Sequence, residues 1–351
     1  MPLAIILWAL RSPLRLLNIL FLYCRFLLSS AKVKRQGQEG LTVPLFLIIS
    51  ATARCNLSCA GCYSRFYSRE GELSFKELDS LVRESKELGT FFYVMAGGEP
   101  LLKQGLSDLC RKHKDVVFLL FTNGMLIDES IAADFRKLNN AAVMLSIEGF
   151  QGETDDRRGK GVYRKILEAM CILRRQDVFF GFSATVSRSN FSAVAQDRFL
   201  DDMIGNGCRM GVFVDYIPAA GGEELALTDE ERVFMRAKTL GWKKKKELLL
   251  FQLPEDEHEL GGRCFSAGYG FLHITSKGYV EPCPFVHFAT ENIKDKPFRE
   301  ILRSPFLAEL RKKESALAPG KLGCGLFENT AEVEKIASAF NAVNTVVRRT
   351  S

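Results

Sequence analysis

The stretch from residue 41 to residue 218 alternates short apolar runs with amphipathic stretches of helical period. Apolar runs of this kind are typical of strands buried on both faces of a parallel sheet, with right-handed helical crossovers between them. Six such runs occur: Thr42–Ser50, Phe91–Ala96, Val116–Phe121, Ala142–Ile147, Val178–Val186 and Met210–Ile217. We therefore predict an α/β fold, a partial (β/α)6 TIM-like barrel that falls short of the eight units of a closed barrel.

The helical stretches carry recognisable end signals. Phe75–Leu88 follows Ser74, and Glu77 stands three residues after that serine, which predicts a capping box. After Pro218 the alternation stops, and we expect three further helices over Leu227–Leu250, Pro297–Lys312 and Ala331–Val347. In barrels of this kind the chemistry lies on loops that follow the strand ends, so motifs at those positions predict function.

The formal net charge of +6 is concentrated at the start of the chain. Residues 1–38 contain no Asp or Glu and six basic residues, namely Arg11, Arg15, Arg25, Lys32, Lys34 and Arg35. These six account for the whole excess, so the rest of the chain is neutral. A protein that binds nucleic acid needs a basic face on its folded body, so this distribution argues against a nucleic-acid partner.

Residues 1–30 are otherwise mostly apolar. Three arginines interrupt every window long enough to span a bilayer, which argues against a transmembrane helix. The basic residues do not precede the apolar run, which argues against a secretory signal.

The polar residues of this leader lie on one narrow stripe of a helix that Pro13 is expected to kink or divide. They are Arg11, Arg15, Asn18, Arg25 and Ser29. A wide apolar face beside a basic stripe, followed by the polybasic residues 32–35, favours a helix lying at the membrane–water interface. The alternative is a helix that packs across the domain or against a dimer partner.

Ten cysteines are distributed unevenly, and three of them fall within eight residues. In a chain of this length such clustering is typical of metal or Fe–S ligands in a reducing compartment, so we expect a cytoplasmic protein. Cys24, Cys110 and Cys171 lie in apolar helical patterns and are expected to be buried structural thiols.

The loop after the first predicted strand contains Cys55, Cys59 and Cys62. Three thiolates at this spacing can bind three irons of a [4Fe–4S] cluster and leave the fourth iron open to a small chelating ligand. A zinc site normally has four ligands in paired clusters, and the sequence offers no fourth Cys or His nearby.

This CxxxCxxC loop resembles the signature of radical S-adenosylmethionine (SAM) enzymes, and motifs at successive strand ends extend the resemblance. Gly97-Gly98-Glu99-Pro100 follows the second strand and resembles the GGEP motif of that family. Thr122-Asn123-Gly124 follows the third strand and resembles its TNG turn. Ser146-Ile147-Glu148-Gly149 resembles the SxDG motif with Glu in place of Asp, and Arg158-Gly159 resembles a step common in members with a C-terminal extension.

The resemblance implies that the three cysteines hold a [4Fe–4S] cluster and that SAM chelates its open iron. It places Glu99 at the SAM amine, Ser146 and Glu148 at the ribose, and Tyr216 near the adenine. The implied cofactor-binding residues are Gly97, Gly98, Glu99, Pro100, Asn123, Ser146, Glu148, Thr185 and Tyr216. Reduction of SAM in this family releases methionine and a 5′-deoxyadenosyl radical, which abstracts hydrogen from an unactivated C–H bond.

A second group of cysteines resembles a SPASM or twitch extension, which implies an auxiliary [4Fe–4S] cluster. Cys264 and Cys283 match the first half of that pattern, since Gly278 stands five residues before Cys283, and Cys324 is the third ligand that the resemblance implies. The full SPASM pattern has cysteines enough for two clusters, and this chain has fewer, so we expect one auxiliary cluster. Its fourth ligand stays open among the substrate and three residues, Cys208, His273 and His287.

We accordingly divide the chain into four parts. Residues 1–38 form the membrane-surface helix, 39–222 the radical SAM core, 223–258 a linking helix, and 259–351 the twitch/SPASM-like region with the C-terminal helices. The anchor favours an enzyme that is peripheral on the inner face of the membrane and acts on a lipid or other membrane-borne substrate. A flavodoxin or ferredoxin is the expected reductant.

Two other functions stay open. The chain can be a peptide- or protein-modifying SPASM enzyme, although the roughly 40 residues before the first strand leave no room for a peptide-recognition domain of about 80–90 residues. It can also be a non-catalytic Fe–S electron-transfer protein, against which the intact GGEP and CxxxCxxC motifs argue. The motifs do not name the small molecule, lipid or peptide that is the substrate.

Overall fold

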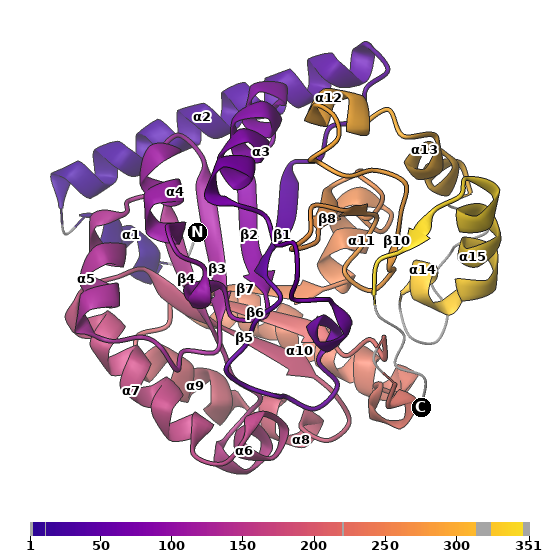
Figure 1. The fold of residues 1–351 in the computed structure, drawn as a ribbon. Helices are drawn as coiled ribbons and strands as arrows, with labels where there is room; N and C mark the ends of the chain where they lie inside the picture. Colours follow the sequence, from indigo (N-terminus) through magenta and orange to yellow (C-terminus); the bar gives the residue numbers. More distant parts are fainter. Residues whose placement is uncertain (1–2, 11, 220, 314–323, 347–351) are drawn as a thin grey trace. The chain divides into compact units, whose positions relative to one another are not determined.

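A computed structural model describes residues 3–10, 12–219, 221–313 and 324–346 of the 351-residue chain. Its central feature is a nine-stranded sheet with the order β7-β6-β5-β4-β3-β2-β1-β8-β9 (Figure 1). Strand β1 pairs in parallel with β2 and β8, strands β4 to β7 pair in parallel in succession, and β8 and β9 are antiparallel. The strands of this sheet are β1 (Phe46–Thr52), β2 (Phe92–Gly97), β3 (Val117–Thr122), β4 (Ala141–Ser146), β5 (Phe180–Val186), β6 (Met210–Asp215), β7 (Leu249–Leu253), β8 (Phe271–Ile274) and β9 (Val280–Glu281).

Helices connect the strands in the alternating order that the sequence predicts. Those of the first half are α1 (Leu3–Leu10), α2 (Pro13–Gln38), α3 (Phe75–Leu88), α4 (Leu106–Lys112), α5 (Glu129–Lys137), α6 (Gln151–Arg158) and α7 (Val162–Arg175). Those that follow are α8 (Phe191–Val194), α9 (Asp197–Gly205), α10 (Asp229–Lys245), α11 (Glu255–Gly261), α12 (Phe298–Ile301), α13 (Pro305–Lys312), α14 (Gly325–Glu328) and α15 (Thr330–Ala339). A separate antiparallel pair joins β10 (Phe288–Ala289) to β11 (Val343–Asn344). The predicted α/β fold with a partial TIM-like barrel is confirmed.

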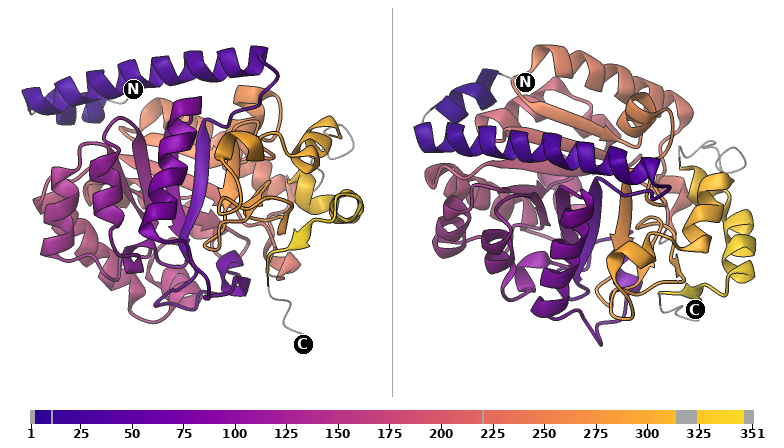
Figure 2. Two further views of the ribbon diagram at one scale, coloured as in Figure 1. Left: turned by 45° about the horizontal axis from the view of Figure 1, so that its top comes forward. Right: turned by 90° about the horizontal axis from the view of Figure 1, so that it is seen from above.

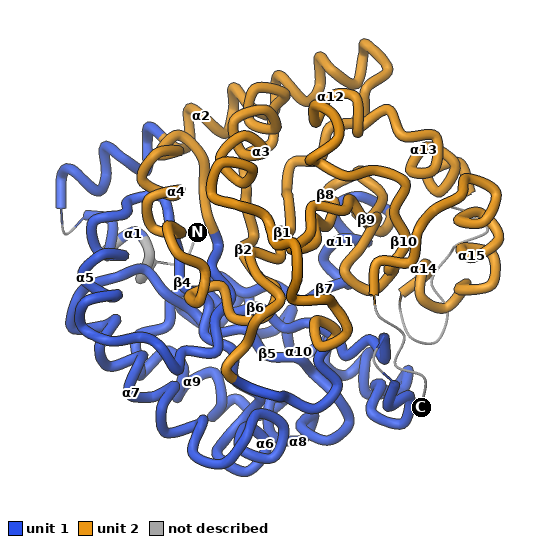
Figure 3. The backbone as a smooth tube through the Cα atoms, viewed as in Figure 1, with its two compact units in different colours: residues 1–21, 57–62, 119–262 blue, residues 22–56, 63–118, 263–351 orange. Residues whose placement is uncertain are grey.

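The chain forms two compact units that alternate along the sequence (Figure 3). Unit 1 contains residues 1–21, 57–62 and 119–262, with strands β4 to β7. Unit 2 contains residues 22–56, 63–118 and 263–351, with strands β1, β2, β8 and β9. The four-part division of the chain at residues 38, 222 and 258 stays a prediction.

The sheet contains strands beyond the six that the sequence assigned to the barrel. The predicted helix Leu227–Leu250 ends at Lys245, and its last two residues begin β7, which pairs with β6. Strand β8 lies within residues 261–288, where the sequence indicates turns and short strands, and it pairs with β1. Both strands are short apolar runs, which periodicity alone does not assign to helix or strand.

The predicted C-terminal helices are shorter than expected. The predicted helix Pro297–Lys312 is divided into α12 and α13, because the Ser304 hydroxyl caps a new helix that begins at Pro305. The predicted helix Ala331–Val347 ends at Ala339 in α15, and its last residue lies outside the described residues. The capping box predicted before α3 is confirmed, because Ser74 Oγ accepts from Glu77 N while the Glu77 carboxylate accepts from Ser74 N at 2.6 Å.

Pro13 divides the N-terminal helix as predicted, and α2 then continues as one rod of 26 residues (Figure 2). Its first turns contact unit 1. Arg15 Nη2 forms an ion pair with Asp177 Oδ2 at 2.6 Å, Trp8 Nε1 of α1 donates to Asp177 Oδ1 at 3.0 Å, and Asn18 Nδ2 donates to the Asn139 carbonyl at 2.6 Å.

The later turns of α2 contact unit 2. Arg25 Nη2 forms an ion pair with Asp115 Oδ2 at 2.9 Å, and the Phe26 ring packs against Phe91 with 5.6 Å between ring centroids. Ser29 is buried beside Gly89, where a Cβ atom would stand 2.9 Å from the Ser29 carbonyl oxygen. The polar stripe of α2 therefore faces the folded chain.

This orientation corrects one sequence-based expectation. Three residues of the predicted stripe, Arg15, Asn18 and Arg25, contact protein partners and not a membrane, while Arg11 lies outside the described residues. The apolar face of α2 points outward, with Leu14 79% exposed and Leu17 62% exposed. The reason lies in the acidic partners Asp115 and Asp177, which stand far along the sequence from the helix.

Candidate functional site

The loop that carries the first cysteine of the CxxxCxxC motif begins where β1 ends, in unit 2. Glu72 holds this strand end, because its Oε1 accepts from the Thr52 hydroxyl at 2.7 Å and from Ala53 N at 2.8 Å. The other carboxylate oxygen of Glu72 pairs with Arg54 at 3.4 Å. These contacts fix the backbone immediately before Cys55, which is partly exposed.

The GGEP motif lies at the end of β2, directly beside the end of β1 in unit 2. Gly98 N donates to the Thr52 carbonyl at 2.7 Å, and Glu99 N donates to the Arg54 carbonyl at 2.8 Å. A Cβ atom on Gly98 would collide with the Arg54 carbonyl, and Gly97 has a φ of +111°. The two glycines are therefore required by the close approach of these strand ends. Glu99 and Pro100 are buried, and Glu99 Oε1 accepts from Leu101 N at 3.1 Å.

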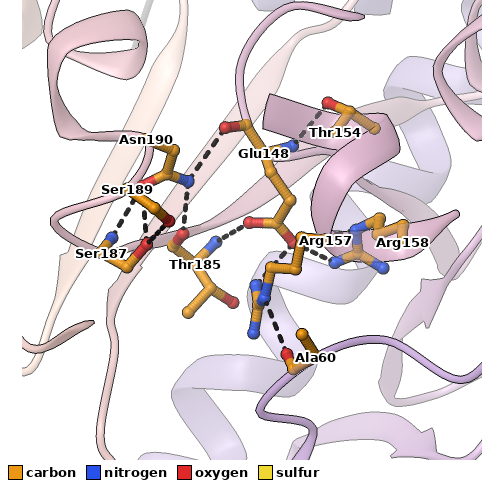
Figure 4. A network of polar contacts seen from close by, with 9 residues as sticks. All are labelled: Ala60, Glu148, Thr154, Arg157, Arg158, Thr185, Ser187, Ser189 and Asn190. Atoms are coloured by element: carbon orange, nitrogen blue, oxygen red, sulfur yellow. Dashed lines mark hydrogen bonds and ion pairs between the residues drawn. The ribbon is translucent and has the colours of Figure 1, made fainter. Parts of the chain in front are cut away.

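The other two cysteines of the motif, Cys59 and Cys62, lie in unit 1 on a loop that the end of α6 holds in place. Ala60 N donates to the Arg157 carbonyl at 3.0 Å, and Arg157 Nε donates to the Ala60 carbonyl at 3.3 Å (Figure 4). Tyr216 lies against the same loop, because a Cβ atom on Gly61 would stand 2.6 Å from the Tyr216 hydroxyl. That hydroxyl donates to the Gly221 carbonyl at 2.6 Å.

Glu148 follows β4 and is the centre of a buried polar network in unit 1, which we call the Glu148 network (Figure 4). Arg158 Nε donates to Glu148 Oε1 at 2.8 Å, and Arg157 Nη1 forms an ion pair with the same oxygen at 2.7 Å. Thr185 N donates to Glu148 Oε2 at 3.1 Å. Asn190 Nδ2 donates to the carbonyls of Glu148 at 2.9 Å and Thr185 at 2.8 Å.

Burial and a nearby guanidinium act in opposite directions on the Cys59 thiol in unit 1. Burial raises the pKa of the Cys59 thiol, while the Arg158 guanidinium opposes that rise. Burial would lower the pKa of Arg158, but the charges of Glu148 and of the Cys59 and Cys62 thiolates raise it. A charged, largely buried guanidinium therefore stands near Cys59, where it offsets part of the cost of burying the metal-binding thiolate.

The remaining predicted contacts of SAM lie in unit 1 at strand ends. Asn123 is buried, and its Oδ1 accepts from Met125 N at 3.0 Å in the turn after β3. Ser146 is partly buried at the last position of β4, opposite Ser183 of β5. The sequence did not indicate that Arg157 and Asn190 contact the cysteine loop or Glu148, since no local pattern distinguishes these two residues from other polar residues.

All ten cysteines lie among the described residues, and none of them is in a disulfide. Cys283 and Cys324 are buried and Cys264 is partly exposed. The expectation of buried structural thiols is confirmed for Cys110 and is wrong for Cys24 and Cys171, which are exposed on the outer sides of α2 and α7.

A second buried polar network lies in unit 2 and centres on Glu281 of β9, so we call it the Glu281 network. His273 Nε2 contacts Ser50 Oγ at 2.8 Å, and His273 Nδ1 contacts Glu281 Oε2 at 2.5 Å. The Tyr67 hydroxyl donates to Glu281 Oε2 at 2.7 Å and lies 2.8 Å from His287 Nδ1. The sequence carried no signal for this network, whose members are spread over more than 200 residues.

The thiols of the two cysteine groups are suitable ligands for Fe–S clusters. Within the described residues no three His, Cys, Asp or Glu side chains converge on a position for a single metal ion. A [4Fe–4S] cluster instead binds each ligand on a different iron, so it needs reduced thiols held farther apart. The cysteines have the spacing of the family, are not in disulfides and lie on loops with fixed backbones, one of them near the Arg158 cation, so they meet that need.

The fold and these loops define the class of the protein. Residues 49–186 match the radical SAM superfamily, and residues 264–324 match the iron–sulfur cluster-binding SPASM domain. The chain therefore belongs to the radical SAM superfamily as a member with a C-terminal SPASM domain, and it is a radical SAM enzyme.

Proteins with assigned activities are similar to this chain over most of its length. The AdoMet-dependent heme synthase of Methanosarcina barkeri is 26% identical over 314 residues, which cover 81% of this chain and 88% of that protein. The mycofactocin maturase MftC of Mycobacterium tuberculosis is 27% identical over 310 residues, which cover 82% of this chain and 78% of that protein.

Solved structures share the fold. SuiB of Streptococcus suis bound to S-adenosylmethionine has a TM-score of 0.68 at 18% identity and covers 85% of this chain and 75% of its own. The enzyme anSMEcpe with bound AdoMet has a TM-score of 0.61 at 20% identity and covers 84% of this chain and 97% of its own.

Proposed function

We propose that this radical SAM enzyme works on a membrane surface and abstracts hydrogen from an unactivated C–H bond of a substrate that arrives from the aqueous side. The observation that carries the proposal is the orientation of α2. Its polar stripe contacts the folded chain through Arg15 and Arg25, and its apolar face is exposed. The cytoplasmic, inner-face location follows from the reduced cysteines and the basic residues of this helix.

Cys55, Cys59 and Cys62 are the residues that would bind the SAM cluster, since their thiols are partly exposed and not in disulfides. With cluster and SAM bound, the cofactors supply reductive cleavage of SAM and hydrogen abstraction, and the electron would come from a flavodoxin or ferredoxin. The chain contributes binding, orientation and exclusion of water. In this proposal the Arg158 guanidinium offsets part of the burial that disfavours the Cys59 thiolate.

The SAM-binding residues divide into direct and supporting groups. Glu148 supports the site, because Arg158 and Thr185 N already occupy its two carboxylate oxygens. Glu99 would meet the SAM amine and Ser146 the ribose. The other residues proposed to line the SAM site are Gly97, Gly98, Pro100, Asn123, Thr185 and Tyr216.

Cys264, Cys283 and Cys324 would bind one auxiliary [4Fe–4S] cluster in the SPASM region. Support comes from the match of residues 264–324 to a cluster-binding domain and from the reduced state of the three thiols. The three belong to unit 2.

The membrane proposal depends on the outer face of α2, which consists of the exposed large side chains of this helix. They are Leu14, Leu17, Leu20, Phe21, Tyr23, Leu27 and Leu28. A row of apolar side chains this long is rare on a soluble surface and matches the face that an interfacial helix inserts into lipid. Lys32, Lys34 and Arg35 are exposed in the turns that follow and suit anionic headgroups.

A surface position is favoured over a spanning one. Helix α2 is long and apolar enough to cross a bilayer, with 6% of its most apolar window buried. Crossing would place Arg15 and Arg25 in hydrocarbon and break their ion pairs with Asp177 and Asp115. Lying on the surface keeps both pairs and buries only the outer face.

The direction of the strands separates α2 from the catalytic loops within each unit. In unit 1, Arg15 contacts Asp177 before β5, while Thr185 stands near the other end of that seven-residue strand, about 20 Å away. In unit 2, Phe26 contacts Phe91 before β2, while Gly98 follows β2. A substrate drawn straight from the bilayer would meet the wrong strand ends, so a peptide or other aqueous substrate is favoured over a membrane lipid.

Vesicle flotation tests the membrane proposal. Full-length protein is expected to float with vesicles of anionic phosphatidylserine and phosphatidylcholine and to float less at high salt. The variant Leu14→Gln/Leu17→Gln/Leu20→Gln should lose about tenfold in partitioning for each leucine.

The matched control is Val233→Gln/Leu260→Gln, which removes two exposed apolar side chains of α10 and α11. This control should float like wild type. Equal flotation of the α2 variant and wild type would contradict the proposal. Loss of flotation in the control would also contradict it, because exposed apolar side chains outside α2 would then contribute to membrane binding.

The second part of the proposal to test is that the substrate is a peptide. One structure of SuiB contains a precursor peptide, and that protein has the same fold as this chain. In that case 5′-deoxyadenosine formation should respond to a cognate peptide and not to vesicles alone. Stimulation by extracted membrane lipid, with a mass change in that lipid, would instead favour a lipid substrate.

A further inference from the structure

His287 has one ring nitrogen that is buried and has no hydrogen-bond partner among the residues that the structure describes. It precedes β10 in unit 2, its side chain is 13% exposed, and its Nε2 atom is shielded from solvent. An unpaired buried nitrogen costs free energy unless a ligand or ion meets it, so it needs an explanation.

The neighbours of His287 determine which nitrogen carries the proton. The Tyr67 hydroxyl has one hydrogen, and it donates this hydrogen to the Glu281 carboxylate at 2.7 Å. The hydroxyl oxygen therefore accepts from His287 Nδ1 at 2.8 Å, so Nδ1 carries the proton. The lone pair is then on Nε2. A histidine that donates one N–H to a fixed acceptor and presents the other nitrogen as a lone pair has the arrangement of a metal ligand.

His287 lies next to a predicted ligand of the auxiliary cluster. Val286 N donates to the Cys283 carbonyl at 3.1 Å, so the chain turns tightly between Cys283 and His287. The Thr345 N–H donates to the His287 carbonyl at 3.0 Å and holds the residue from the other side.

The other two protein candidates for the fourth ligand are less suited. Both ring nitrogens of His273 are in contacts, one with Ser50 and the other with Glu281. Cys208 belongs to unit 1, and its burial among apolar groups raises its pKa far above the ordinary value, which opposes the thiolate that iron needs. His287 is the candidate whose donor atom is both unpaired and in unit 2.

We propose that His287 Nε2 is the fourth protein ligand of the auxiliary cluster held by Cys264, Cys283 and Cys324. The inference rests on the auxiliary cluster of the proposed function. Coordination transfers no electron and releases no proton, since Nε2 donates a lone pair that it already has. A neutral imidazole in place of a thiolate makes the cluster less negative, so its reduction potential is higher than with four cysteines.

The test uses full-length protein with Cys55→Ala/Cys59→Ala/Cys62→Ala, so that only the auxiliary cluster remains. After anaerobic reconstitution and dithionite reduction, pulsed EPR should detect a directly bound nitrogen, and 15N-histidine labelling should change that signal. The His287→Cys change should remove the nitrogen coupling, retain the cluster and lower its potential. His258→Ala, which changes a histidine of α11, should leave the spectrum unchanged.

The possible outcomes distinguish failure of the His287 proposal from failure of the auxiliary-cluster proposal. A reduced cluster without any nitrogen coupling, or one whose coupling survives His287→Cys, would overturn the ligand and leave the auxiliary cluster standing. Absence of iron from the triple cysteine variant, with normal SAM cleavage by wild type, would overturn the auxiliary cluster and the ligand together.

Discussion

Two buried networks, each centred on a glutamate without solvent exposure, differ in how the negative charge is balanced. In the Glu148 network two guanidinium groups, Arg157 and Arg158, pair with the carboxylate. In the Glu281 network the partners are His273, the Tyr67 hydroxyl and the Thr345 hydroxyl. Arginine is charged at every accessible pH, whereas histidine and hydroxyl groups share protons.

The Glu148 network is therefore stabilised mainly by charge pairing, and the Glu281 network mainly by hydrogen bonds. The Glu148 network has no uncommitted carboxylate oxygen, and its Arg158 charge reaches the cysteine loop. The Glu281 network orders protons from Ser50 to His287 and ends on an unpaired nitrogen. Burial would raise the pKa of Glu281, but the charge and hydrogen bond of His273 do most to bring it below its ordinary value.

The largest expected effect comes from breaking the Glu148 network. Arg158→Ala leaves the buried Glu148 carboxylate with one guanidinium, so unfolding should require about 3–5 kcal/mol less free energy. Urea denaturation of the cluster-free protein measures the change. Arg198→Ala, which removes an exposed arginine of α9, is the control and should change stability by less than about 0.5 kcal/mol. A loss below about 1 kcal/mol for Arg158→Ala would mean that Arg157 alone balances the charge.

Asp215 is a third buried carboxyl group, and it tests whether neighbouring groups are needed to keep such a carboxylate ionised. Burial raises the pKa of Asp215, at the end of β6, to about 7, and neither of its oxygens has a hydrogen-bond partner in the described part of the chain. The folded state then holds a proton that the unfolded state releases near pH 4. This contribution to stability is complete below pH 4 and is lost as pH rises through about 7.

Asp215→Asn should remove that pH dependence. The variant is expected to be about 2–4 kcal/mol more stable than wild type at pH 8 and close to wild type at pH 4. Thermal unfolding across this pH range checks the prediction. If wild type gains stability between pH 5 and 8 relative to the variant, Asp215 is ionised in the folded state and the assignment is wrong.

The smallest effect is expected for the hydroxyl that joins the two halves of the Glu281 network. Tyr67→Phe removes the hydrogen bonds to Glu281 and His287 and should cost about 1–3 kcal/mol, measured by urea denaturation. Tyr23→Phe, which changes an exposed tyrosine of α2, is the matched control. A Tyr67→Phe loss as small as that of the control would show that the two histidines are held without this hydroxyl.

The sequence predicted the parts of the molecule that depend on local pattern. Six strands, the α3 capping box and the break at Pro13 all follow from neighbouring residues, and the structure confirms them within a few positions. The CxxxCxxC and GGEP motifs likewise fall at the strand ends where a barrel concentrates chemistry.

The remaining features depend on residues far apart in the chain. The inward direction of the α2 stripe required Asp115 and Asp177, which are 90 and 162 residues from their arginines. Single contacts of the Glu281 network join residues up to 223 positions apart, so no spacing rule reveals it. The sequence assigned the glycines of the GGEP motif to SAM binding. The structure adds a second reason for glycine at position 98, because the Arg54 carbonyl approaches it too closely for a side chain.

The central claim is that the cysteine loop and the SAM-binding strand ends support radical SAM chemistry. The most direct test is to reconstitute full-length protein with iron and sulfide anaerobically, reduce it with dithionite in the presence of SAM, and measure 5′-deoxyadenosine by mass spectrometry. Wild type should form 5′-deoxyadenosine, and Cys55→Ala/Cys59→Ala/Cys62→Ala should form none. Failure of wild type to form it while holding about eight Fe per chain, as expected for two [4Fe–4S] clusters, would contradict the account.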